Sequence, residues 1–142
     1  MKADRASYVL DSYAVLAYLQ GEACAGHVRS LIEMAQADDV ALAICLVNLG
    51  EVLHIVERKR GLMAAHQVIA ALEQLPLSIV AADRSLTFAA AHVKANCTLS
   101  YADAFSVALG QRLGAAIVTG DAEFHSAEAL VEVMWLEQSE AH

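Results

Sequence analysis

Short apolar runs alternate with segments of helical character, and this alternation constrains the fold more than any other feature. The runs lie at residues 8–10, 40–44, 77–81 and 116–119, and residues 131–135 resemble a fifth. Uninterrupted apolar strands that alternate with helices are typical of a parallel sheet covered on both faces. The pattern therefore predicts an α/β fold, with a central, mostly parallel sheet of four or five strands and helices on both faces. The expected helices occupy residues 12–19, 25–37, 46–60, 62–75, 85–95 and 100–113.

Glycine and proline mark the ends of several of these helices. Gly61 and Gly114 each follow a helical segment, and Pro76, the only proline, stops another. Asp83 stands where a helix N-cap is expected. Since the chain contains no linker of low complexity and no internal repeat, we expect one domain over residues 1–142.

The amino-acid composition indicates in which cellular compartment such a chain is expected. The longest stretch without Asp, Glu, Lys or Arg covers residues 61–72, whereas a bilayer span needs about 18–20 apolar residues. The N-terminus has no long apolar core typical of a signal peptide. The three cysteines are far apart, which favours reduced thiols. These features predict a cytoplasmic protein without membrane contact.

The net charge of −8 argues against nucleic-acid binding unless several acids hold metal ions. One basic cluster stands out, at Arg58, Lys59 and Arg60. Its ordinary interpretation, which we favour, is a helix C-terminus whose cations complement the helix dipole. In the alternative interpretation these residues, together with Arg84 or Arg112, form a local track for RNA phosphates.

Four acids lie where a site is expected in an α/β fold, at the carboxyl ends of strands. Asp11 follows the first strand and Asp121 follows the fourth, while Asp103 lies in the first turn of its helix. Each has a local alternative role as a helix or turn cap, and Asp103 forms an S-x-x-D pattern with Ser100. Glu51 lies in the middle of a helix with mixed neighbours, so it caps nothing.

Taken together, these acids indicate a metal site. Carboxylates that gather without basic partners repel one another. Mg²⁺ or Mn²⁺ relieves this repulsion because hard cations prefer oxygen ligands. A cation held in this way activates both a phosphate group and an attacking water molecule.

Four segments in order, VLDSYAVLAYL, NLGEVLHIVERKRG, LSYADAFSVALG and IVTGDAEF, resemble the PIN-domain ribonucleases, and among them the VapC-type toxins. The resemblance covers nearly the whole chain. It implies that Asp11, Glu51, Asp103 and Asp121 form a Mg²⁺ or Mn²⁺ site for hydrolysis of RNA phosphodiester bonds. It further implies supporting roles for three polar residues, Ser12, Thr119 and Asn48.

The same resemblance implies partners: an RNA substrate, a second copy of the chain in a homodimer, and an antitoxin protein that covers the acidic site. The alternative hypothesis is a PIN-like module that binds RNA or protein without cutting.

His54, one turn from Glu51, is interpreted as a packing histidine rather than a proton shuttle.

Overall fold

A five-stranded sheet forms the centre of the protein, in a computed structural model that describes residues 5–136. The strand order is β3-β2-β1-β4-β5, and all four strand pairs are parallel. The strands are β1 (Ala6–Leu10), β2 (Val40–Cys45), β3 (Leu77–Val80), β4 (Ala116–Thr119) and β5 (Val133–Trp135). The predicted α/β fold with a parallel sheet is confirmed. Within the described range no helix is long and apolar enough to cross a membrane.

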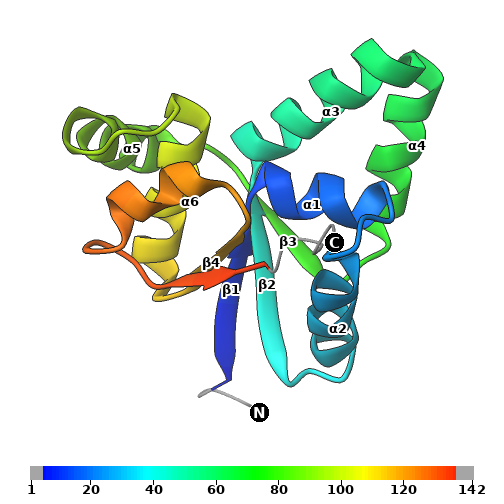
Figure 1. Ribbon diagram of the computed structural model, residues 1–142, viewed down its shortest axis with the longest axis horizontal. Helices are drawn as coiled ribbons and strands as arrows, with labels where there is room; N and C mark the ends of the chain where they lie inside the picture. The colour runs from blue at the N-terminus through cyan, green and yellow to red at the C-terminus, as the bar shows by residue number, and fades with distance from the viewer. Residues whose placement is uncertain (1–4, 137–142) are drawn as a thin grey trace, which may run out of the picture.

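Helices cover both faces of this sheet (Figure 1). They are α1 (Ser12–Leu19), α2 (Ala25–Gln36), α3 (Leu46–Arg60), α4 (Leu62–Glu73), α5 (Arg84–Asn96), α6 (Tyr101–Leu113) and the 3₁₀ helix η1 (Ala122–Ala127). Side chains of successive strand residues point to opposite faces. In β1, Leu10 packs with α1 to α4, whereas Val9 packs with α5, α6 and η1. Two apolar cores therefore lie on the two sides of one sheet.

The helix ends follow the capping signals in the sequence. Asp83 accepts a hydrogen bond from Leu86 N at the start of α5, and Ser100 accepts one from Asp103 N at the start of α6. The α3–α4 connection is a single residue, Gly61, with a φ of 92°. Glycine adopts this conformation without steric cost, so two helices can meet there in a sharp corner.

The main difference from the prediction lies at the last strand. Residues 131–135 were expected to form it, but β5 begins at Val133. The N–H of Val131 donates to Ala127 O, and the carbonyl of Glu132 accepts from Ile117 N. Residue 131 therefore closes the turn after η1, which delays the regular strand by two residues.

The strand order determines where polar groups meet. Because β1 lies between β2 and β4, residues that follow these three strands share the carboxyl edge of the sheet. Helices α1 and α3 begin at this edge, directly after β1 and β2. The first turn of α6 contributes to the same edge, since Asn48 at the start of α3 donates to Ala102 O.

Candidate functional site

An open cleft at the carboxyl edge of the sheet contains all four predicted acids. Its walls come from α1, α3, α6, η1 and the loop before α6. The acids that line the cleft are Asp11, Glu51, Asp103 and Asp121, joined by Glu123; the other lining residues are Ser12, Tyr13, Leu16, Ile55 and Ser100. The fold thus brings into one cavity carboxylates from distant parts of the sequence, of which Asp11 and Asp121 are more than a hundred residues apart.

Asp11 is the most buried of these acids, with 1% of its surface exposed. Its Oδ1 accepts a hydrogen bond from Ala14 N at 2.8 Å, so it caps α1 as the local interpretation predicted. Its Oδ2 accepts a hydrogen bond from Thr119 Oγ1 at 2.5 Å. The capping role and the position in the cleft therefore coexist in a single side chain.

Burial raises the pKa of Asp11 from 3.8 to about 7, against the opposing effect of the Thr119 and Ala14 hydrogen bonds. The negative charges of Asp103 and Asp121 add to the increase. At neutral pH a carboxyl group with this pKa is only partly deprotonated. A nearby cation would favour its charged form.

Asp103 enters the cleft from the first turn of α6 and is 6% exposed. Its backbone N–H donates to Ser100 Oγ at 3.1 Å. Desolvation is the largest cause that raises its pKa to about 7, and the neighbouring charges of Asp121, Glu51 and Glu123 raise it further. Two carboxyl groups of the cleft are therefore held in surroundings that disfavour their ionised forms.

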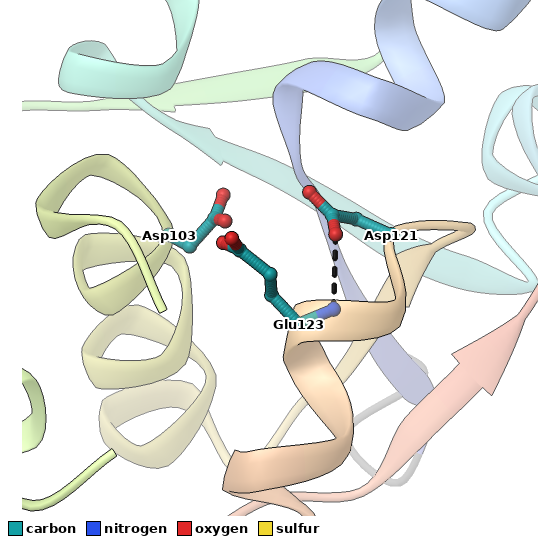
Figure 2. A group of neighbouring side chains, drawn as sticks. All are labelled: Asp103, Asp121 and Glu123. Carbon is teal, nitrogen blue, oxygen red and sulfur yellow. Dashed lines mark hydrogen bonds between the residues drawn. The ribbon is translucent and has the colours of Figure 1, made fainter. Parts of the chain in front are cut away.

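Asp121 and Glu123 approach Asp103 from the opposite wall (Figure 2). One carboxylate oxygen from each of the three residues lies within 4.8 Å of the other two. Asp121 Oδ1 accepts a hydrogen bond from Glu123 N at 2.9 Å, which begins η1. Glu123 is not among the acids predicted from the sequence, where Asp121 had a turn cap as its local alternative role. The available signal was an acid two positions after the acid that follows β4.

The supporting residues predicted from sequence lie around these acids. The hydroxyl of Ser12 donates to Glu51 Oε1, which links α1 to α3. Thr119 Oγ1, while donating to Asp11, accepts from Asp121 N at 3.0 Å. Asn48 does not line the cleft: its amide donates to Ala102 O at 3.0 Å, and its Oδ1 accepts from Ser106 Oγ at 2.9 Å. Asn48 thereby joins the starts of α3 and α6.

The donor set fits a hard divalent cation. All five acids offer carboxylate oxygens, which Mg²⁺ and Mn²⁺ prefer. Among residues 5–136, no Lys, Arg or His is ion-paired with any of the five. The arrangement therefore gathers negative charge without an internal partner, and the three oxygens of Asp103, Asp121 and Glu123 are spaced closely enough for direct or water-mediated ligation of one ion.

His54 lies outside this group. It is exposed and does not line the cleft, so its interpretation as a packing histidine is wrong. The reason lies in the rotation of the helix. Val52 and Val56 of α3 face the core, and a position two residues from each points to nearly the opposite side.

Comparison with known proteins identifies the family of this chain. The family described as the PIN domain matches residues 8–130, and the chain therefore belongs to the PIN domain family. No curated protein sequence matches the chain.

Several solved structures share the fold. VapBC from Salmonella typhimurium bound to DNA superposes with a TM-score of 0.73 at 13% identity, covering 93% of this chain and 99% of that one. VapBC2 from Rickettsia felis, bound to a promoter DNA fragment, gives 0.71 at 14% identity, with coverages of 92% and 99%. VapC20 from Mycobacterium tuberculosis, described as a sarcin–ricin loop cleaving toxin, gives 0.68 at 21% identity, with coverages of 90% and 98%.

Proposed function

We propose that the protein is a metal-dependent ribonuclease of the VapC type, the toxin of a toxin–antitoxin pair. The observation that carries this proposal is the convergence of five carboxylates on one cleft without a cationic partner among the described residues. Membership of the PIN domain family and the fold shared with VapC20, described as a sarcin–ricin loop cleaving toxin, support it.

We assign direct metal ligation to Asp103, Asp121 and Glu123, because their oxygens lie closest together. Asp11 and Glu51 complete the site. Both Asp11 oxygens already accept hydrogen bonds, so it would act through its remaining lone pairs or a water molecule. When bound, Mg²⁺ or Mn²⁺ would lower the pKa of a bound water and stabilise charge on the phosphate.

The remaining polar groups hold these acids in place. Thr119 orients the Asp11 carboxylate and the backbone of Asp121, and Ser12 orients Glu51. Asn48 fixes the distance between α3 and α6, and so between Glu51 and Asp103. Such outer contacts support metal affinity because they restrict the positions of the ligands.

The partners follow from the same assignment. The structures with the same fold include VapBC complexes, which supports a cognate antitoxin for this chain. We further propose a homodimer that acts in the cytoplasm, with the antitoxin covering the acidic cleft. The high apolar content, 58% of residues, is compatible with both interfaces.

The test is cleavage of RNA by the purified protein, free of antitoxin, with Mg²⁺ or Mn²⁺. We expect metal-dependent cleavage of total cellular RNA, lost in Asp103→Asn and Asp121→Asn. Glu73→Gln, which removes an exposed acid on α4, is the matched control and retains activity. If wild-type protein binds RNA but cuts none with either metal, the non-cutting module becomes the correct assignment.

A further inference from the structure

A second groove, between α1, α3 and α4, lies beside the acidic cleft. Leu16 lines both cavities, so the two share a wall. The second groove has apolar sides from Leu19, Val56 and Val68, and its far end contains Lys59 and Arg60. Figure 1 shows the three helices, with α1 lying near the angle that α3 and α4 form.

Helix periodicity explains why the two cavities lie side by side. On α3, Glu51, Ile55 and Lys59 follow one another at intervals of four residues and form one row along the helix. The first two line the acidic cleft and the third lines the groove. At 1.5 Å per residue, Glu51 and Lys59 are about 12 Å apart along the helix. On α1, Ser12 and Gln20 flank Leu16 at the same interval.

The two cations in the second groove are unusual in a chain with a net negative charge. Lys59 and Arg60 are exposed, and neither is in an ion pair within residues 5–136. By contrast, Arg112 is paired with Asp83. Complementing the helix dipole accounts for cations in the last turn of α3. It does not require two of them to line an apolar groove that adjoins the acidic cleft.

We propose that this groove is the path of a single-stranded RNA away from the metal site. The proposal rests on the proposed ribonuclease function. One phosphate binds at the metal site, the bases that follow pack against the half-buried side chains of Leu16 and Leu19, and a later phosphate binds Lys59 and Arg60. A polyanion with apolar base faces fits a path that would have a bound divalent cation at one end, two cationic side chains at the other and apolar side chains between them.

The test compares Lys59→Gln/Arg60→Gln with the control Arg29→Gln/Lys94→Gln, which removes two exposed cations on α2 and α5. Binding of fluorescein-labelled single-stranded RNA, about twelve nucleotides long, is measured by anisotropy in Ca²⁺ at several salt concentrations. We expect the groove variant to bind about tenfold more weakly, and the slope of log K against log salt to fall by about 0.7, the contribution of the one phosphate contact that Lys59 and Arg60 share on a single strand.

Cleavage in Mn²⁺ provides a second measurement. The groove variant should cut the long RNA more slowly but cut a trinucleotide at the wild-type rate, because a trinucleotide occupies only the metal site. If the groove variant cuts both RNAs at the wild-type rates and binds RNA as tightly as wild type does, the proposed RNA path is wrong. The groove would then be left to an apolar protein segment. If wild type cuts neither RNA, the proposed ribonuclease function itself fails, which is a distinguishable result.

Discussion

Thr119 donates its hydroxyl hydrogen to Asp11 across a distance of 2.5 Å, and both side chains are almost completely buried. Thr119 is the last residue of β4, Asp11 directly follows the neighbouring strand β1, and the two are 108 positions apart in the chain. The same hydroxyl accepts the backbone N–H of Asp121. One oxygen atom therefore connects two of the acids of the cleft.

The substitution Thr119→Val should remove this connection between Asp11 and Asp121. Valine has a similar shape but leaves a buried Asp11 oxygen and the Asp121 N–H without this partner, at a cost of about 1–3 kcal/mol in the free energy of unfolding. We expect a higher Mn²⁺ concentration for half-maximal RNA cleavage, because Asp121 also loses its anchor. Thr119→Ser, which keeps the hydroxyl, should restore the metal dependence. A Val variant that loses stability while its Mn²⁺ dependence stays unchanged would limit Thr119 to a structural role.

The stability of the metal-free protein should decrease as pH rises. Burial raises the pKa of Asp11 and of Asp103 from 3.8 to about 7. Between about pH 4 and pH 7 the folded protein therefore holds protons that the unfolded chain has released, and stability falls across this range. Added Mn²⁺ should raise the melting temperature more at pH 8 than at pH 5, because protons compete with the metal for these groups.

Asp103→Asn is the control for this effect. It removes one of the two titrating groups, so the melting temperature of the metal-free variant should depend less on pH over the same interval. A wild-type melting temperature that rises steadily from pH 4 to pH 8 in EDTA would contradict the raised pKa values.

Glu123→Gln tests the acid that the sequence analysis did not identify. The substitution keeps the size of the side chain but removes its charge, and we expect Mn²⁺ affinity to fall by about 10–100-fold. Glu73→Gln makes the same chemical change on the exposed surface of α4 and should leave affinity unchanged. Isothermal titration with Mn²⁺ measures both. Equal affinities in the two variants would remove Glu123 from the metal site.

Two glycines in helices should respond oppositely to alanine. A Cβ at Gly110 would lie 2.6 Å from Ile117 Cδ1 and 3.1 Å from the Ala115 carbonyl oxygen, so Gly110→Ala should destabilise the protein by about 1–3 kcal/mol. Gly50 in α3 has no atom within 4 Å of such a Cβ, and Gly50→Ala should stabilise the protein by about 0.5–1 kcal/mol. Urea denaturation distinguishes them, and a tolerated Gly110→Ala would contradict the close approach of α6 to β4.

The sheet could be predicted from sequence because its strands are apolar on both faces, and apolar runs such as residues 40–44 have few other stable arrangements. The strand ends then located Asp11 and Asp121. Glu51 was recognisable because it lies in mid-helix without a capping role. These predictions depend on local patterns that tertiary contacts do not change.

The remaining features depend on geometry that a one-dimensional pattern does not contain. Glu123 reaches the cleft only because η1 is a tight 3₁₀ turn capped by Asp121. The exposed position of His54 follows from the rotation of α3 about its axis. The groove that ends at Lys59 requires α1, α3 and α4 to pack together, and no short segment specifies this packing.

The strand order has a consequence for biosynthesis. Asp11 and Glu51 leave the ribosome before β4, which carries Thr119, leads to Asp121 and Glu123 and inserts beside β1 at the centre of the sheet. A nascent or prematurely terminated chain that lacks β4 and the residues after it has only part of the acidic cleft. Any activity that needs all five acids is therefore absent until the segment through Glu123 has been made.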